Sequence, residues 1–243
     1  MRPENYDAVL CDLDGCLVSG AVVLPGAQDL LRRAGGRLTI LTNNSTDTPT
    51  SLSNRLSGMG LAVPPDRIVL AGTAAVDHLA AQPGVRVRLF GSAVLQGYAS
   101  ASGLTLVKEG PTHVLLAKDT SFSFGDLHEV ISLLSSGVCL VVANPDVSYP
   151  GPDGLPVPET GSCLAAVLSI LPDLSYEVIG KPEPRLYEAA LRRYPGPTGR
   201  VLAIGDNPLT DAEGARRLGF DFILVGPQAF SWTDVDRYLS ELL

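Results

Sequence analysis

The sequence has few cysteines and histidines, and their spacing is not that of a structural metal site. Its 4 cysteines contain no C-x-x-C pair, and its 3 histidines are scattered along the chain. Zinc sites usually draw their ligands from closely spaced pairs of such residues. We therefore expect ordinary buried thiols and unremarkable surface or core imidazoles rather than a zinc centre.

Basic runs are also missing. The chain has 18 Lys and Arg against 26 Asp and Glu, which gives a net charge of −8, and its pI is near 4.8. A protein that binds nucleic acid or an anionic membrane needs a positive surface. We expect neither partner. An anionic substrate can still bind, because surface charges are screened over about 8 Å and a cation in a pocket acts locally.

Long uncharged apolar runs are absent as well. The N-terminal MRPENYDAVLCDLD lacks the apolar stretch of a secretory signal, and the uncharged apolar stretch at residues 130–145 is interrupted by Ser135, Ser136 and Gly137. That stretch is too short to cross a bilayer. We expect a cytoplasmic protein without a membrane partner. With 45% hydrophobic residues among 243, the chain can bury a sizeable core.

Apolar runs alternate with helical patterns at both ends of the chain. The patterns predict strands at 8–13, 37–41, 176–179, 200–204 and 222–225, and helices at 27–34, 50–58, 184–194, 211–218 and from Thr233 onward. This order is typical of a parallel sheet covered by helices. We expect the two ends of the chain to share one sheet.

A second series of the same kind separates the two ends. It predicts strands at 85–90, 114–117 and 138–143, helices at 93–101 and 127–134, and a Pro/Gly-rich exit at 144–161. By length this is a small module of its own. We expect a core domain of residues 1–80 and 173–243 and an inserted α/β domain of residues 81–172.

Polar residues follow the predicted core strands. In open α/β sheets the ligand crevice lies beyond the carboxyl ends of the strands. The residues found there are Asp12, Asp14, Thr42, Asn43, Asn44, Lys181, Asp206 and Asp211. Each alone is commonly a turn residue, a helix cap or a surface lysine. Together, in this order, they indicate one acidic site with an ammonium and a hydroxyl.

These residues form four motifs: DLDGC (12–16), LTNN (41–44), GKPEP (180–184) and GDNPLTD (205–211). The set resembles the haloacid dehalogenase-like (HAD) phosphatase superfamily, in the same order and with its gap for an inserted cap. The closest resemblance is to the NagD-like, p-nitrophenyl phosphatase branch (type IIA, C2 cap), whose cap motif is echoed at 143–146. Cys16 stands where Thr or Val is usual, and Ala212 where Ile is common. We attach no meaning to either small residue.

The resemblance implies an α/β fold, with a three-layer Rossmann-like parallel-sheet core and an inserted α/β cap domain. It also implies Mg²⁺ as cofactor, held by the side chains of Asp12 and Asp206 and the backbone carbonyl of Asp14. A cation is needed on electrostatic grounds, because a phosphate dianion beside a carboxylate is repelled by about 8 kcal/mol at an effective dielectric near 20. Hard oxygen ligands favour Mg²⁺.

By the same resemblance, Asp12 is the nucleophile that forms an aspartyl-phosphate, and Asp14 is the general acid and base. Thr42, Asn43 and Asn44 are expected to bind the phosphate, and Lys181 to neutralise its charge. Asp211 and Asn207 are expected to lie behind the residues that touch the metal and the phosphate, with Asp211 orienting Lys181 or a metal-bound water.

The expected substrate is a small phosphorylated metabolite: a nucleotide, a sugar phosphate, phosphoglycolate or pyridoxal phosphate. The insertion should contact its leaving group, with Asn144, Asp146 and the loop near Asp119 as contacts by analogy. Caps of this branch often mediate dimers, so a homodimer is compatible with the resemblance. Tyr98, Phe122 and Phe124 line a pocket or form core, and Trp232 is expected to pack near the last helix.

Three other readings remain open. A response-regulator receiver uses a similar acidic pocket, but the order of its lysine and its smaller size fit poorly. A phosphomutase or a dehalogenase keeps the fold and changes the reaction, although a dehalogenase has no use for Asp14. A non-catalytic phosphate-binding or signalling protein is the third, and the completeness of the motifs counts against it.

Overall fold

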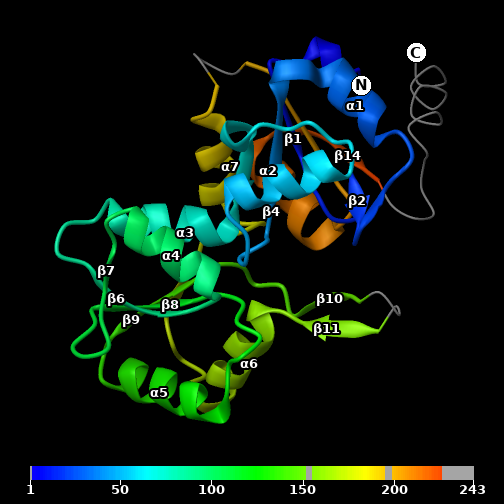
Figure 1. Cartoon of the computed structure of the whole chain (residues 1–243). Helices are drawn as coiled ribbons and strands as arrows, with labels where there is room; N and C mark the ends of the chain where they lie inside the picture. The colour runs from blue at the N-terminus through cyan, green and yellow to red at the C-terminus, as the bar shows by residue number, and fades with distance from the viewer. Residues whose placement is uncertain (1, 152–154, 195–198, 226–243) are drawn as a thin grey trace. The chain divides into compact units, whose positions relative to one another are not determined.

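The computed structural model describes residues 2–151, 155–194 and 199–225. As far as they are described, these residues form two compact units (Figure 1). The first consists of Met1–Thr42, Pro49–Val69 and Lys181–Leu243, and the second of Asn43–Thr48 and Leu70–Gly180. Along the chain, the second unit is therefore inserted into the first.

The first unit is built on a five-stranded sheet in the order β14-β13-β1-β4-β5, flanked by helices (Figure 1). The described pairings of β1 with β13 and β4, and of β13 with β14, are parallel. The sheet strands are β1 (Ala8–Cys11), β4 (Leu38–Thr42), β5 (Ile68–Leu70), β13 (Val201–Gly205) and β14 (Asp221–Leu224). The remaining elements are the hairpin β2 (Val18–Ser19) and β3 (Val22–Val23), the helices α1 (Ala27–Ala34), α2 (Pro49–Gly58), α7 (Pro184–Leu191) and α8 (Glu213–Leu218), and the 3₁₀ turns η1 (Pro3–Asn5), η2 (Gly35–Arg37) and η3 (Pro65–Arg67).

The central strands are buried on both faces. Every residue of β1, β4 and β13 is buried. Strands covered by helices on both sides carry continuous apolar runs instead of an alternating pattern, which is what the sequence shows at these positions. The predicted α/β class with a parallel core sheet is confirmed.

The helix predicted at 211–218 has a different start. A short π-helix, η4 (Pro208–Ala212), precedes α8, which begins at Glu213. The reason is local: the Asn207 side chain accepts a hydrogen bond from the backbone N–H of Leu209 at 2.9 Å, and the Asn207 carbonyl accepts one from Asp211 N–H, also at 2.9 Å. The helix ends as expected at Gly219, which adopts φ +70°.

The second unit has its own five-stranded sheet, in the order β12-β9-β8-β6-β7, and all its pairings are parallel. Its strands are β6 (Arg86–Phe90), β7 (Thr105–Leu106), β8 (His113–Leu116), β9 (Cys139–Val142) and β12 (Tyr176–Val178). Its helices are α3 (Ala71–Ala80), α4 (Ala93–Ala101), α5 (Phe124–Ser135) and α6 (Thr160–Ile170), and the antiparallel strands β10 (Ser148–Pro150) and β11 (Pro156–Pro158) lie in the Pro/Gly-rich segment.

The strand at 176–179 was predicted to join the core sheet, and this prediction is wrong. β12 pairs with β9 of the second unit, with Glu177 opposite Val141. Helix α3 also belongs to this unit, because Ala75, Val76 and Leu79 pack into its hydrophobic core. The main segment of this unit therefore runs from Leu70 to Gly180, whereas the sequence suggested 81–172. Apolar periodicity identifies a strand but not the sheet it joins.

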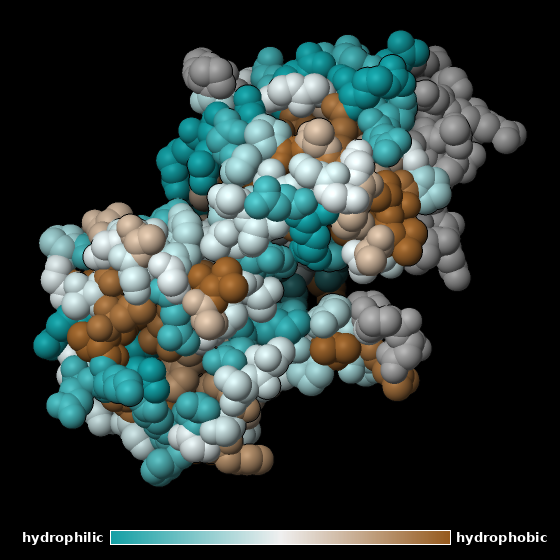
Figure 2. Space-filling view, in the orientation of Figure 1, coloured by the Kyte–Doolittle hydropathy of each residue, from teal (hydrophilic) through white to brown (hydrophobic). Residues whose placement is uncertain are grey.

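The aromatic residues of the insertion have different surroundings. Phe122 packs edge-on against Phe90, with ring centroids 5.9 Å apart, and Tyr98 packs against the core while its hydroxyl donates to Asp77 at 2.9 Å. Phe124 is 89% exposed at the start of α5. On the face shown in Figure 2, hydrophobic residues emerge as separate patches among hydrophilic ones. Phe122 and Tyr98 are thus partly buried residues that pack against the cores of this unit, and Phe124 is a surface residue.

In the parts of the chain that the structure describes, no helix has both the length and the apolar character needed to cross a membrane. The predicted helix from Thr233, and Trp232 beside it, lie outside the described residues.

A short segment, Asn43–Thr48, contacts the second unit although it follows a core strand in the sequence. The hydroxyl of Ser45 accepts a hydrogen bond from the backbone N–H of Lys118 at 3.0 Å. The backbone of Ser45 lies against Gly72, where an added Cβ would come within 2.8 Å of the Ser45 Cα. Only glycine fits at this point of α3.

We predict that Gly72→Ala lowers the free energy of unfolding by about 1–3 kcal/mol, because the backbone of Ser45 has to move. The matched control is Gly97→Ala in α4, where an added Cβ meets nothing within 4 Å. That change should stabilise the protein by up to about 1 kcal/mol through helix propensity. Urea unfolding of both variants measures the difference, and equal effects would contradict the assigned packing.

Candidate active site

The acidic residues of the first unit gather where its parallel strands end. Asp12 directly follows β1 and Asp206 directly follows β13, and the last residue of β1, Cys11, is in register with Ile204. The backbone N–H of Asp12 continues the ladder by donating to the Ile204 carbonyl at 2.8 Å. Thr42, the buried last residue of β4, ends the neighbouring strand. These three side chains therefore start from one edge of the sheet.

Lys181 is buried between two carboxylates. Its Nζ lies 2.7 Å from Asp12 Oδ1 and 2.7 Å from Asp211 Oδ1, and the side chains of all three are at most 11% exposed. Burial alone lowers the pKa of Lys181, but Asp12 and Asp211 outweigh it and keep the pKa well above its ordinary value. Lys181 is therefore a fixed positive charge at this site.

The pKa of Asp12 is subject to opposing influences. Burial raises its pKa, Lys181 opposes the rise, and the carboxylates of Asp211 and Asp206 add to it, so that the pKa lies well above its ordinary value. Burial likewise raises the pKa of Asp206 to about 6, with Asp211 contributing. One ammonium among these carboxylates leaves an excess of negative charge, which favours a bound cation.

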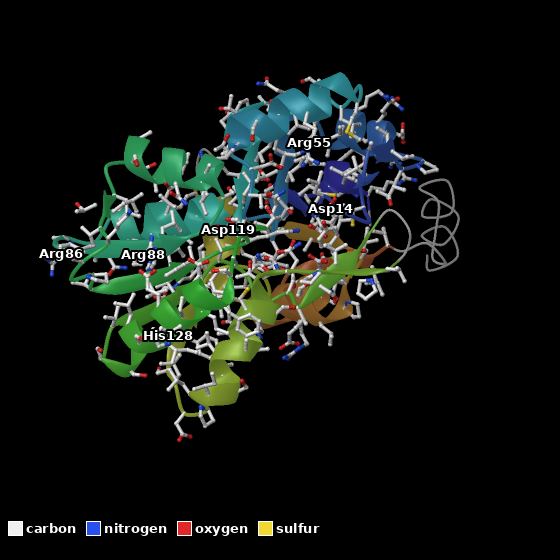
Figure 3. The ribbon with its side chains drawn as sticks, turned by 60° about the horizontal axis from the view of Figure 1, so that its bottom comes forward. Asp14, Arg55, Arg86, Arg88, Asp119 and His128 are labelled. Atoms are coloured by element: carbon white, nitrogen blue, oxygen red, sulfur yellow. The ribbon has the colours of Figure 1, made fainter. Side chains whose placement is uncertain are left out.

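The loop after β1 shapes the site. Gly15 adopts φ +80°, and a Cβ there would overlap the Asp206 carboxylate. The backbone N–H of Gly15 donates to the Val18 carbonyl at 2.8 Å, and Asp14 forms a β-bridge with Val18. Asp14 is exposed, unlike Asp12, and Figure 3 labels it in the dark-blue N-terminal part of the first unit.

Asn43 and Asn44, predicted to bind phosphate, belong to the second unit. The Asn43 amide donates to Asp146 Oδ2 at 3.0 Å. The Asn44 Oδ1 accepts hydrogen bonds from the backbone N–H groups of Thr46 and Asp47, both at 2.9 Å, which is a local side-chain turn. In the structure these amides therefore have partners within their own unit.

The insertion residues named by analogy are also bonded within the second unit. Asn144 is 1% exposed, and its amide donates to the hydroxyls of Ser45 and Thr160 at 3.3 and 3.2 Å. Asp119 accepts hydrogen bonds from the backbone N–H and the hydroxyl of Ser121 at 2.8 and 2.6 Å. Asn144 is thus an internal strut of this unit, and Asp119 orders its own loop.

Asn207 and Asp211 hold each other in place. The backbone N–H of Asn207 donates to Asp211 Oδ2 at 3.2 Å, while Asp211 Oδ1 accepts from Lys181. Both carboxylate oxygens of Asp211 are therefore occupied. The Asn207 side chain shapes the π-helical turn, so its contribution to the site is structural.

Tyr187 supports this arrangement. Its role is not visible in the sequence, because it lies among the buried apolar residues of α7. Its hydroxyl is within 3.3 Å of the Asp211 carbonyl and 3.4 Å of the Thr210 carbonyl, and the residue is 1% exposed. The ring fits because residue 214 is glycine: a Cβ there would overlap the tyrosine ring and hydroxyl. Tyr187 fixes the backbone of the residue that orients Lys181.

Cys16 is a further residue at the site, although its small side chain pointed to no function in the sequence. Its Sγ and one carboxylate oxygen each of Asp12 and Asp206 all lie within 4.8 Å of one another. Cys16 is 2% exposed. A hydrogen bond with Cys11, together with burial, raises the pKa of the Cys16 thiol well above its ordinary value.

Comparison with known proteins identifies the family to which this chain belongs. A family model described as haloacid dehalogenase-like hydrolase matches residues 9–105, and one described as HAD-hydrolase-like matches residues 178–239. The chain is 31% identical to dihydroxyacetone phosphatase of Corynebacterium glutamicum, over 94% of this chain and 84% of the relative.

Solved structures give the same result. The glycerol phosphate phosphatase of Mycobacterium tuberculosis in complex with magnesium matches with a TM-score of 0.83 and 29% identity, over 92% of this chain and 69% of that one. NagD of Escherichia coli matches with a TM-score of 0.83 and 27% identity, over 95% and 91%. The chain belongs to the haloacid dehalogenase-like hydrolases, in their NagD-like phosphatase branch.

We predict that Tyr187→Phe lowers kcat for a chromogenic phosphate ester about fivefold with little change in KM, because a lost hydrogen bond of about 1 kcal/mol loosens Asp211. Tyr194→Phe is the matched control, since the hydroxyl of Tyr194 donates to the Arg37 carbonyl at 2.6 Å in the same unit.

Both phenylalanine variants should lose similar stability in urea. Only Tyr187→Phe should slow turnover, and its effect should be smaller when combined with Asp211→Asn, because both changes act on one contact. Equal kcat losses in the two tyrosine variants would show that Tyr187 has no special link to the site.

Proposed function

We propose that the protein is a Mg²⁺-dependent phosphatase that hydrolyses a small phosphate monoester through an aspartyl-phosphate on Asp12. The observation that carries this proposal is the buried Lys181, whose ammonium lies 2.7 Å from Asp12 at the carboxyl edge of the sheet. An ammonium in this position can neutralise an anionic phosphoryl group beside an attacking carboxylate. The phosphatase activities named for the relatives support the same reaction.

The donor set suits the metal. Carboxylate oxygens of Asp12 and Asp206 lie within 4.8 Å of each other, and Mg²⁺ needs only one or two protein carboxylates in addition to the phosphate and water. The backbone carbonyl of Asp14 is the third ligand that we propose. When bound, the cation neutralises the phosphate dianion and allows the carboxylate to approach it.

The residues of the chain then divide the chemistry. Asp12 Oδ attacks phosphorus, and the bond from phosphorus to the ester oxygen breaks. Asp14 gives its proton to the departing oxygen and afterwards takes one from the water that cleaves the aspartyl-phosphate. Water and phosphate monoester become alcohol and inorganic phosphate, and both aspartates return to their starting state.

The remaining residues bind and orient. Thr42, with a buried hydroxyl at the end of β4, donates to a phosphoryl oxygen, and Lys181 neutralises the charge on the same group. Asp211 and Asn207 keep Lys181 in place. Asn43 and Asn44 contribute backbone amides, since their side chains have the partners described above.

We further propose that the inserted domain, predicted at 81–172 and lying within the second unit, acts as a cap that selects the leaving group. Catalytic groups set on a rigid sheet, with variable contacts supplied by an insertion, allow one chemistry to serve many substrates. The substrate is a small phosphorylated metabolite, in keeping with the dihydroxyacetone, nucleotide and glycerol phosphates named for relatives.

The test is a panel of phosphate monoesters ranked by kcat/KM with Mg²⁺ and after EDTA treatment, with Asp12→Asn as the nucleophile variant. The wild-type protein should hydrolyse these esters only when Mg²⁺ is present. Rapid acid quench with a ³²P-labelled ester should trap a phosphoenzyme in wild type and none in Asp12→Asn. Thr39→Val, a change outside the site on β4, is the folding control. Phosphoenzyme in Asp12→Asn would overturn the assignment.

Metal binding should depend on pH. Because Asp206 has a pKa of about 6 and must lose its proton to bind a cation, the apparent Mg²⁺ affinity should rise about tenfold per pH unit below that value and level off above it. Calorimetric Mg²⁺ titrations across this range measure the effect. In Asp206→Asn the contribution of Asp206 should disappear and only the pH dependence that belongs to Asp12 should remain, and a wild-type profile identical to that of the variant would contradict the role of Asp206.

A further inference from the structure

Cys16 adds a sulfur atom to a site otherwise made of oxygens. It lies in the turn between β1 and β2, and its Sγ is within 4.8 Å of carboxylate oxygens of Asp12 and Asp206. Among the described residues, Asp12, Cys16 and Asp206 form a group of three metal-binding side chains whose ligand atoms are close enough to hold one ion. The sulfur therefore lies beside the two carboxylates proposed to bind Mg²⁺.

The turn holds the thiol in place. The backbone N–H of Leu17 donates to the Leu13 carbonyl at 2.9 Å, and Gly15 gives the chain its left-handed step. Asp206 approaches so closely that a side chain at residue 15 would overlap it. The three ligand atoms thus come from segments fixed by backbone hydrogen bonds and by packing, which is what a metal site requires.

The three atoms differ in the ions they prefer. Mg²⁺ takes hard oxygen ligands and gains little from sulfur, whereas Zn²⁺ and Cd²⁺ bind thiolate strongly. Two carboxylate oxygens and one thiolate supply three of the four ligands that a tetrahedral site needs, and water can be the fourth. A valine or threonine at residue 16 would lack the sulfur.

We propose that Cys16 is a ligand that gives this site a second specificity: a thiophilic divalent cation of the Zn²⁺ or Cd²⁺ type binds to Cys16, Asp12 and Asp206 and displaces Mg²⁺. Binding replaces the S–H bond by a metal–sulfur bond and releases the proton to water, with no change in oxidation state. The inference uses the metal site of the proposed function, but it does not depend on turnover.

The experiment is a Cd²⁺ titration of protein freed of metal with EDTA, followed by the ultraviolet charge-transfer absorption of the cadmium–thiolate bond and by calorimetry. Wild type should show this absorption at one equivalent of Cd²⁺, and excess Mg²⁺ should reduce it. Cys16→Ser and Cys16→Val should lose it, and their Cd²⁺ affinity should fall about tenfold or more.

Cys139→Ser is the matched control, because Cys139 is exposed on β9 of the second unit; it should keep the absorption. Cys11→Ser tests the neighbouring buried thiol and should keep it as well. If Cys16→Val does not fold by circular dichroism, the nearly isosteric Cys16→Ser carries the test. Absorption that survives in Cys16→Ser, or is missing in wild type, overturns the proposal.

The outcome is separable from that of the proposed function. An active phosphatase without the cadmium–thiolate absorption overturns the role of Cys16 and leaves the phosphatase assignment intact. A protein that shows the absorption but has no phosphatase activity overturns the phosphatase assignment and leaves the role of Cys16 intact. The two measurements therefore test the two proposals independently.

Discussion

The site depends on one interaction, the burial of the Lys181 ammonium between the carboxylates of Asp12 and Asp211. A buried charge is costly unless it is paired and hydrogen-bonded, and removal of one partner leaves the others uncompensated. Each of the three side chains therefore fixes the position of the other two. The group still carries more negative than positive charge once Asp206 is included, and that excess gives the site its attraction for a cation.

The fold brings these charged side chains together from segments that are far apart in the sequence. Parallel strands β1 and β13 end at the same edge, so Asp12 and Asp206 meet although far apart in sequence. The chain passes between the two units at four points, two of which are Thr42–Asn43 and Gly180–Lys181. Two of the proposed site residues, Thr42 and Lys181, are thus the residues of the first unit that border these junctions.

Two residues that contact the catalytic groups have no recognisable functional signature in the sequence. Tyr187 reads as one more apolar residue of α7, yet its hydroxyl holds the backbone of Asp211, and Gly214 makes room for its ring. Cys16 reads as a small packing residue, yet its sulfur lies beside two carboxylates. In both cases the importance comes from the approach of another segment, and no spacing within the local sequence records that approach.

The sequence alone determined the fold class, most core elements and the residues at the strand ends, because buried parallel strands need continuous apolar runs and their polar termini stand out against them. It did not determine which sheet Tyr176–Val178 joins, where the inserted unit begins, or which partners the amides of Asn43 and Asn44 take. Those depend on contacts between segments distant along the chain. Only the tertiary structure decided them, since pairing and packing energies are set by neighbours that local periodicity cannot identify.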